Sequence, residues 1–313
     1  MSSLHVIFGA GPAGLATMEA LQRRGLQVRM VTRSSKPALP AGVELLHGDA
    51  SDPGFAIEAS KGAAVVYQTL NAPYHQWAEL FPALQRAVLA GARASGARLV
   101  TLENLYGYGA VDVPMTEDLP LRPTSEKGKV RAAMTRELLD AASEMEIAIA
   151  RASDFFGPRV TESALGERAI TPILAGRSAQ VVGDPDRLHA FTYMPDLGET
   201  MATLGTRDEA VGQVWHVPTT SSWTTRKAIE HIAHIAGVRP RVSAAPKALL
   251  WLLGWFQPPV REVIEMLYQF ERDFELDSSH FTETFGLHAT PMEQALGETV
   301  SWYRTAHEDA QAH

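Results

Sequence analysis

Short apolar runs alternate with longer amphipathic stretches through the first half of the chain. A short apolar run bounded by polar or glycine residues is typical of a strand buried on both faces, and the longer stretches predict helices. The pattern predicts strands at Leu4–Phe8, Gln27–Val31, Val43–Leu46, Ala64–Gln68, Arg98–Leu102 and Ile147–Arg151, and its clearest helices at Trp77–Ser95 and Lys127–Glu144. This alternation predicts an α/β fold with a Rossmann-type, doubly wound parallel sheet and right-handed crossovers.

The second half of the chain lacks this alternation. Glycine, proline and aromatic residues are mixed through it, although Phe191–Arg207 is expected to return to the Rossmann core. We therefore expect a dinucleotide-binding Rossmann domain from residues 1–158 plus about 190–210. A smaller, mixed C-terminal substrate-binding domain is expected from about 159–189 and 211–313.

Three glycines follow the first predicted strand and precede the helical pattern of residues 15–24. Glycines in this position let the backbone turn sharply and approach a pyrophosphate, and the helix N-terminus offers unpaired N–H groups and a favourable dipole. The context predicts a dinucleotide site, and a turn of purely structural role is the alternative. The predicted cofactor residues of this segment are Gly9, Gly11, Pro12, Ala13 and Gly14.

The end of the second predicted strand bears on which dinucleotide binds. Proteins selective for NAD usually carry Asp or Glu there to bond the ribose 2′-hydroxyl, but this chain has Thr32-Arg33-Ser34-Ser35-Lys36. Arg33 can pair with a 2′-phosphate, and no carboxylate is present to repel one. We therefore expect NADP as the cofactor, with NAD less favoured. The alternative is a solvated basic turn.

The composition is typical of a soluble enzyme with a small-molecule substrate. The 313 residues are 45% hydrophobic and carry a formal net charge of −8, which disfavours a nucleic-acid partner. The chain has no cysteine, which excludes disulfides and thiol catalysis. Only three residues precede the first strand and no apolar stretch reaches bilayer length, so we expect no signal peptide and no transmembrane segment. A cytoplasmic location is the default expectation.

One apolar region towards the C-terminus bears on the substrate. Leu249–Phe256 and Met266–Phe270 are rich in apolar and aromatic residues. Such a region could roof an apolar substrate pocket, or bury a contact in a homodimer or at a membrane surface. An ordinary pair of core helices is the alternative.

Further motifs together resemble the extended short-chain dehydrogenase/reductase superfamily, and within it the NAD-dependent epimerase/dehydratase family, over nearly the whole chain. The resemblance implies a Rossmann fold, with Asp49 and Ala50 at the adenine edge and Asn71 behind the cofactor ribose. The motifs are His47-Gly48-Asp49-Ala50, Asn71-Ala72, Leu105-Tyr106-Gly107, Arg151–Arg159, Gly183-Asp184 with Phe191–Asp196, and the closing Gly297–Tyr303.

The family's catalytic Tyr-x-x-x-Lys is missing from the expected helix. In the family, the lysine holds the ribose hydroxyls and lowers the tyrosine pKa, so that the phenol can pass a proton during hydride transfer. Counted from Tyr106, the tyrosine position falls on Lys127 and the lysine position on Arg131. No tyrosine lies between Tyr108 and Tyr193. The chain therefore resembles an atypical member of the family.

Lys127 and Arg131 are four residues apart and share one face of the predicted helix. We predict that Arg131 holds the ribose hydroxyls and that Lys127, if buried beside another cation, donates the proton. Tyr106 and Tyr108 are alternative phenols at the end of the fifth strand. Asn104, near the family's serine or threonine position, could orient a carbonyl. The alternatives are a solvated helix start formed by Lys127, Lys129 and Arg131, and core packing for the two tyrosines.

Substrate contacts are expected from four residues. Tyr108 is one, and Asp154 and Phe155 follow the sixth strand, where the resemblance implies the nicotinamide and substrate pocket. A helix cap is the alternative for Asp154. His189 stands where nucleotide-sugar enzymes of the family carry an arginine for the diphosphate, which disfavours a nucleotide-sugar substrate. A surface histidine is the alternative for His189.

Two classes of function remain open. The favoured one is an NADP(H)-dependent oxidoreductase or epimerase-like enzyme, with non-standard catalytic residues, acting on a carbonyl or secondary alcohol of a small organic substrate. The missing tyrosine instead favours a catalytically inactive NADP-binding regulator. A lyase or isomerase that uses bound NAD(P) is a third alternative. We expect no metal, because His231 and His234 lie three residues apart without an evident third ligand.

Overall fold

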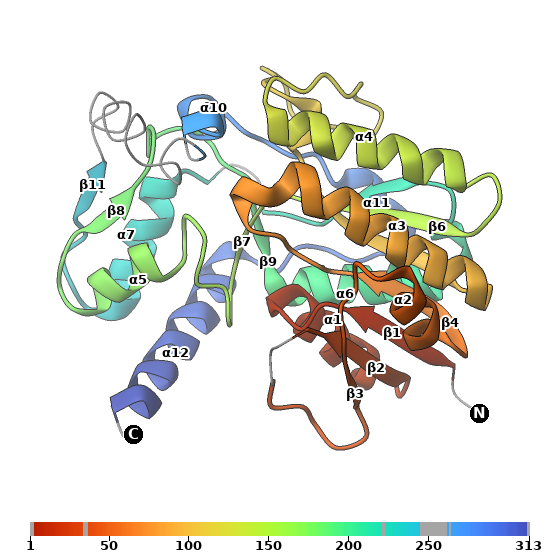
Figure 1. Cartoon of the computed structure of the whole chain (residues 1–313). Helices are drawn as coiled ribbons and strands as arrows, with labels where there is room; N and C mark the ends of the chain where they lie inside the picture. Colours follow the sequence, from red (N-terminus) through yellow and green to blue (C-terminus); the bar gives the residue numbers. More distant parts are fainter. Residues whose placement is uncertain (1–2, 34–36, 221–222, 245–261, 263, 312–313) are drawn as a thin grey trace. The chain divides into compact units, whose positions relative to one another are not determined.

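The computed structural model describes residues 3–33, 37–220, 223–244, 262 and 264–311 (Figure 1). The chain divides into two compact units. Unit 1 comprises Met1–Gly109, Glu117–Ala152 and Pro195–Val217, and unit 2 comprises Ala110–Thr116, Ser153–Met194 and Pro218–His313. The apolar stretch Leu249–Phe256 lies outside the described residues.

Unit 1 is built on a seven-stranded parallel sheet with the order β10-β6-β5-β4-β1-β2-β3. The strand order reverses between β1 and β4, as in the predicted doubly wound Rossmann-type sheet. All six predicted strands are present, whereas β10 was not predicted because three residues are too few to form a recognisable apolar run. The strands are β1 (Leu4–Phe8), β2 (Gln27–Thr32), β3 (Glu44–His47), β4 (Ala63–Gln68), β5 (Arg98–Asn104), β6 (Ile147–Ala152) and β10 (Val214–His216).

Three helices cover one face of this sheet. Phe8 of β1 and Val66 of β4 share a core with Ala56, Val88 and Leu138 of these helices. Two short 3₁₀ helices, η1 and η2, precede the second helix and follow β5. The helices are α2 (Pro53–Ser60), α3 (Trp77–Ser95) and α4 (Glu126–Ala141), and the 3₁₀ helices are η1 (Tyr74–Gln76) and η2 (Tyr106–Tyr108).

Two further helices, α1 (Pro12–Arg23) and α6 (Met194–Thr206), lie together on the other face. Tyr67 of β4, whose side chain points opposite to that of its neighbour in the strand, reaches Gly205 of α6. A Cβ atom at Gly198 would overlap the backbone of Ala16, so the absence of a side chain lets α6 approach α1 closely.

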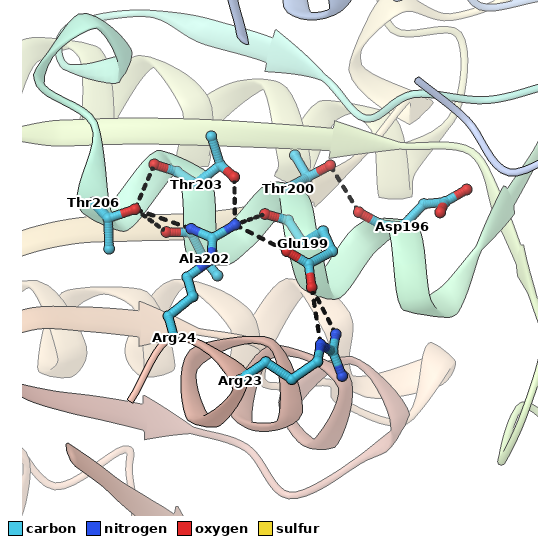
Figure 2. A network of polar contacts seen from close by, with 8 residues as sticks. All are labelled: Arg23, Arg24, Asp196, Glu199, Thr200, Ala202, Thr203 and Thr206. Atoms are coloured by element: carbon cyan, nitrogen blue, oxygen red, sulfur yellow. Dashed lines mark hydrogen bonds and ion pairs between the residues drawn. The ribbon is translucent and has the colours of Figure 1, made fainter. Parts of the chain in front are cut away.

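Two arginines at the end of α1 fix this helix to α6 (Figure 2). Arg23 and Arg24 donate to opposite carboxylate oxygens of Glu199 at 2.7 and 2.9 Å. Arg24 also donates to the hydroxyls of Thr203 and Thr206 at 2.8 and 3.0 Å. Burial alone would raise the pKa of Glu199, but the hydrogen bonds from the two arginines outweigh it and hold that pKa below its usual value. The contact helps to place α1, whose N-terminus carries the glycine segment.

Unit 2 contains two small parallel sheets and a separate apolar core. β7 (Asp154–Phe156) pairs with β9 (Phe191–Tyr193), and β8 (Ala179–Val181) pairs with β11 (Val242–Ala244). The core holds apolar residues of α5, α7 and α12. The described helices of this unit are α5 (Glu167–Leu174), α7 (Thr225–Ala236), α10 (Tyr268–Glu271), α11 (Ser279–Phe285) and α12 (Met292–Gln311). Among the described residues, no helix combines the length and apolar character that crossing a membrane requires.

The observed units differ from the predicted domain bounds at several places. Residues 110–116 and 153–158 were predicted in the Rossmann domain but lie in unit 2. Phe191–Tyr193 pairs with β7 in unit 2 and does not return to the Rossmann sheet, although the helix that follows it lies largely in unit 1. Unit 1 extends to Val217, because Val214–His216 pairs in parallel with β6. That unit 1 binds the cofactor and unit 2 the substrate stays a prediction.

We expect Glu199→Gln to lower the free energy of unfolding by about 1 kcal/mol at pH 7, because the change removes the charge but keeps the shape of a partly exposed side chain. A carboxyl whose pKa is lowered in the folded state stabilises above its unfolded pKa and loses this effect as the pH falls through the folded value. The difference between variant and unmodified protein should therefore shrink at pH 3. Urea unfolding at both pH values measures it.

The control is Glu209→Gln, because Glu209 pairs with Arg207 only two residues away and joins no two elements. A loss at pH 7 that is equal for the two variants would contradict a special role for the contact between α1 and α6.

Candidate functional site

The predicted cofactor residues lie at the carboxyl ends of four neighbouring strands in unit 1. The segment Gly9–Gly14 links β1 to α1, and Arg33 follows β2. Asp49 and Ala50 follow β3, and Asn71 follows β4. Since β4, β1, β2 and β3 are adjacent in the sheet, these residues share one edge. The edge includes the point where the strand order reverses, and open parallel sheets bind ligands there.

The steric surroundings differ at the three glycines of this segment. Gly9 has φ +114°, a conformation that favours glycine, and a Cβ there would overlap Thr69. A Cβ at Gly14 would overlap the carbonyl oxygen of Gly9. Apart from its chain neighbours, no described residue has an atom within 4 Å of the Cβ position at Gly11, and no side chain caps α1, which begins at Pro12. Open backbone beside uncapped N–H groups fits a pyrophosphate.

The polar side chains at this edge are partly held by their neighbours. Arg33 and Asp49 are exposed, and the Asp49 carboxylate accepts from the N–H and hydroxyl of Ser51 at 2.9 and 2.7 Å. These hydrogen bonds, more than the nearby charge of Arg33, hold the pKa of Asp49 below its usual value. Asn71 Oδ1 accepts from the N–H of Ala72 at 3.0 Å. The edge therefore presents an oriented, ionised carboxylate and an exposed guanidinium.

Lys127 and Arg131 lie among aromatic rings near the start of α3 and α4. The Arg131 guanidinium carbon lies 4.9 Å from the ring centroid of Trp77 and 4.0 Å from that of Phe81. Lys127 Nζ lies 5.1 Å from the ring centroid of Tyr74. Both arrangements are cation–π contacts. We call this group the cation–aromatic cluster; its members are Tyr74, Trp77, Phe81, Tyr106, Lys127 and Arg131.

Both cations of the cluster are buried, with 3% of Lys127 and 8% of Arg131 exposed. The alternative of a solvated helix start therefore applies only to Lys129, which is exposed and pairs with Glu126. Burial lowers the pKa of Arg131, and the charge of Glu103 partly offsets this effect, but an arginine remains charged. Arg131 Nε has no hydrogen-bond partner among the described residues, which is uncommon for a buried donor.

Gly128 brings the start of α4 against η2. A Cβ at Gly128 would overlap the carbonyl oxygen of Tyr106, and the Ser125 hydroxyl caps α4 by accepting from the Gly128 N–H at 3.0 Å. The Tyr106 ring stacks on Trp77 with centroids 5.8 Å apart, and its hydroxyl lies 2.7 Å from that of Tyr74. The structure thus brings Tyr106, predicted only as an alternative phenol, into the same cluster as the two cations.

A second set of polar side chains joins β5, β6, β10 and α4; we call it the buried network. Both carboxylate oxygens of Glu103 lie 2.8 Å from the Thr135 hydroxyl, and Arg151 Nε donates to the carboxylate at 3.1 Å. Arg151 Nη1 donates to the Tyr108 hydroxyl at 2.8 Å, and that hydroxyl lies 2.7 Å from His216 Nε2. All five residues are buried.

The buried network bears on two predicted site residues. Burial raises the pKa of Tyr108 to about 12, although Arg151 acts in the opposite direction. The Tyr108 hydroxyl already has a partner on each side, so the structure favours core packing over a substrate contact or a proton donor. Asn104 Oδ1 accepts from the N–H of Tyr106 at 3.2 Å, which commits the oxygen to the turn into η2.

Sequence reasoning missed most of this network. The one available signal was Glu103, a carboxylate at the end of an apolar strand that is buried on both faces. A buried carboxylate requires a partner. The partners come from β6 and α4, so nothing local to Glu103 identifies Arg151 or Thr135.

In unit 2, His189 pairs with Asp154 of β7. His189 Nε2 lies 2.9 Å from Asp154 Oδ2, and Nδ1 lies 3.2 Å from the carbonyl oxygen of Gln269. The imidazole also stacks on Phe270 and Phe274, with ring centroids 4.9 and 5.4 Å away. His189 is 2% exposed, so the alternative of a surface histidine is wrong. The alternative of a helix cap for Asp154 is also wrong, because Asp154 is a strand residue that bonds His189.

Both ring nitrogens of His189 are engaged. The Gln269 carbonyl oxygen can only accept, so the hydrogen bond on that side is donated by Nδ1–H. Phe155, next to Asp154 in β7, is half-buried.

The two histidines of α7 lie side by side. The ring centroids of His231 and His234 are 6.4 Å apart, and His231 meets the Trp223 ring edge-on at 5.9 Å. In the part of the chain that the structure describes, no group of three or more His, Asp or Glu residues could hold a metal ion.

Residues 6–217 match the NAD dependent epimerase/dehydratase family. The chain belongs to this family. Within this enzyme family it has the glycine segment at the end of β1. That Lys127 and Arg131 stand at the positions of the family's catalytic tyrosine and lysine stays a prediction.

One relative by sequence and several solved structures are similar to this chain. The chain is 23% identical to dTDP-glucose 4,6-dehydratase of Streptomyces griseus over 212 residues, which are 65% of this chain and 57% of that protein. A dTDP-glucose 4,6-dehydratase from Bacillus anthracis str. Ames, solved in complex with NAD, is 14% identical, with a TM-score of 0.78 and coverage of 98% of each chain. MoeE5, solved in complex with UDP-glucose and NAD, is 19% identical, with a TM-score of 0.79, and the match covers 97% of this chain and 99% of that one.

We expect Asp154→Ala to lower the free energy of unfolding by about 1–3 kcal/mol, because it leaves a buried imidazole nitrogen without a partner. Asp154→Asn should cost less, since its side-chain amide can still form a hydrogen bond with Nε2. Urea unfolding measures both variants. Asp186→Asn, at an exposed pair with Arg226 in the same unit, is the control. Equal losses for the Ala and Asn variants would contradict the hydrogen-bond assignment.

Proposed function

We propose that the protein is an NADP(H)-dependent oxidoreductase or epimerase-like enzyme acting on a carbonyl or secondary alcohol of a small organic substrate. Arg131 carries the proposal, because its buried Nε has no hydrogen-bond partner among the described residues. A buried donor left unpaired is costly, so it favours a bound molecule that supplies an oxygen. Arg131 stands where the family resemblance implies the group that holds the cofactor ribose.

The residues of unit 1 fit a nicotinamide dinucleotide along the carboxyl edge of the sheet. Gly11 and the uncapped start of α1 would hold the pyrophosphate, Asp49 the adenine edge, and Arg131 the ribose hydroxyls. When bound, the nicotinamide supplies or accepts the hydride. The chain's own residues must then hold the substrate and move the proton.

Two groups of the cation–aromatic cluster are candidates for the proton step. Lys127 carries an ammonium group and Tyr106 a phenol, and both side chains are buried. A positive charge near a phenol stabilises the phenolate, which is the assistance that a phenol needs to release a proton. Lys127 therefore serves the reaction either as the donor or as the charge that activates Tyr106.

The surroundings of His189 favour a substrate other than a nucleotide sugar. Both imidazole nitrogens are engaged, by Asp154 and by the Gln269 carbonyl, and aromatic rings pack on the imidazole. In this arrangement the ring offers no additional donor to a diphosphate. Because relatives are dTDP-glucose 4,6-dehydratases or bind UDP-glucose, both nucleotide sugars belong in the substrate panel together with simple aldehydes, ketones and secondary alcohols.

A dinucleotide-binding regulator is the second candidate. It is favoured by the sequence of α4, which contains no tyrosine. NADPH binding without turnover of any compound in the panel would support the regulator over the enzyme.

We expect NADPH to bind at least about tenfold more tightly than NADH, a difference of about 1.4 kcal/mol. Arg33→Ala should remove this preference, because the guanidinium would no longer pair with the 2′-phosphate. Gly11→Val should weaken both cofactors by filling the space beside the glycine segment. Calorimetric titration measures the affinities, and Arg86→Ala, at an exposed arginine of α3, is the control. Equal affinities in the unmodified protein would exclude the NADP preference.

We expect Arg131→Met to weaken cofactor binding, because hydrogen bonds to the ribose act before any chemistry. Lys127→Met should leave cofactor binding nearly unchanged and lower turnover by roughly a hundredfold or more. Titration and steady-state kinetics separate the two effects. Lys129→Met is the matched control, since Lys129 lies on the same helix but is exposed. If both variants bind the cofactor as tightly as the unmodified protein, the assignment of Arg131 is wrong.

A further inference from the structure

We propose that Tyr74 and Tyr106 form a phenol pair that moves the proton between solvent and the substrate oxygen, with Tyr106 as the acid and Tyr74 as the relay. This inference rests on the proposed function and decides its proton step. It assigns a role to Tyr74, which no sequence motif marks.

The first observation is the distance between the two hydroxyls. Tyr74 of η1 and Tyr106 of η2 are 32 positions apart in the chain, and their hydroxyl oxygens lie 2.7 Å apart. This is the usual length of an O–H···O hydrogen bond. Trp77 packs against both rings, with centroids 4.9 Å from Tyr74 and 5.8 Å from Tyr106, and thereby holds the pair.

The second observation is a difference in exposure that gives the pair a direction. Tyr106 is 8% exposed, whereas Tyr74 is 39% exposed. Tyr74 is thus partly open to water, and its hydroxyl contacts that of the buried Tyr106. A proton leaving Tyr106 can be replaced through Tyr74 without opening the cluster.

The third observation is the positive charge around the pair. Lys127 Nζ lies over the Tyr74 ring, and Arg131 is close enough to interact electrostatically with both phenols. Glu103 is a negative group that also acts on Arg131. The two cations favour a transient phenolate, because an adjacent opposite charge stabilises the ionised form. This is the reason to assign Lys127 to activation and Tyr106 to donation.

In the direction of reduction, Tyr106 gives its proton to the substrate oxygen. The bound cofactor of the proposed function would supply the hydride to the carbonyl carbon, and the C=O electron pair would move to the oxygen that takes this proton. The Tyr106 phenolate takes the Tyr74 proton, and Tyr74 takes one from water or from a buffer acid. Oxidation of an alcohol runs the same transfers in reverse.

The pair can be tested first in the protein without cofactor. Tyr74→Phe and Tyr106→Phe each remove one hydroxyl and keep the ring. If the hydroxyls bond each other, the melting temperature of the double variant should fall by less than the sum of the two single shifts. Tyr67→Phe is the control, because that hydroxyl bonds His5 outside the cluster and should add its shift in full to that of Tyr74→Phe.

The relay is tested with NADPH and a compound of the panel that the unmodified protein reduces. Tyr106→Phe should lower turnover by roughly a hundredfold or more, and Tyr74→Phe by about tenfold. Raising the concentration of imidazole buffer at constant pH should restore turnover in Tyr74→Phe but not in Tyr106→Phe. A small acid can occupy the exposed position, whereas a merely structural role of Tyr74 would give no response to buffer.

The outcomes separate the relay from the proposed function. Three results would each overturn the relay and leave the proposed enzymatic function intact. They are fully additive melting shifts, unchanged turnover in Tyr74→Phe, and a loss of turnover that buffer does not restore. Absence of turnover in the unmodified protein with every compound of the panel would overturn the proposed function, and the relay with it. Coupled melting shifts together with buffer rescue support the proposal.

Discussion

The carboxylate of Glu103 must be compensated inside unit 1, and the arrangement of the cation–aromatic cluster depends on how this is done. The charge lies at the end of β5, and its partners come from β6, through Arg151, and from α4, through Thr135. Removing one partner of such a buried pair typically costs about 3–5 kcal/mol. The same Thr135 hydroxyl lies 3.0 Å from the carbonyl oxygen of Arg131, one turn earlier in α4. Compensation of one charge therefore fixes the helix that carries the two cations.

The start of the same helix is fixed by contact rather than by charge. Gly128 lets α4 meet the backbone of Tyr106 at a distance that no side chain would allow. Held at these two points, the first turns of α4 present Lys127 and Arg131 to aromatic rings from η1 and α3. In the proposed mechanism the family's tyrosine is thus replaced by a phenol from the end of β5, and its lysine by cations of the helix.

Local chemistry explains which parts the sequence could predict. The strands of the sheet and the glycine segment depend on short apolar runs and on the needs of a tight turn, so both are readable from neighbouring residues. The burial of Lys127 and Arg131 was only one of two alternatives, because a four-residue spacing does not tell which helix face is covered. The contacts of Tyr74 and Trp77 could not be predicted, because their partners lie in segments distant in the chain. His189 and Asp154 were each singled out, but their pairing depends on the approach of β7 and β9, which no motif encodes.

The hydrogen bonds of His189 also bring together parts of unit 2 that are distant in the chain. Asp154 lies 35 positions before His189, and Gln269 lies 80 positions after it. Contacts between distant positions form only after the intervening chain has lost conformational entropy, so they slow folding relative to local contacts. The imidazole of His189 is therefore ordered after the helices of unit 2, whose hydrogen bonds join near neighbours in the chain.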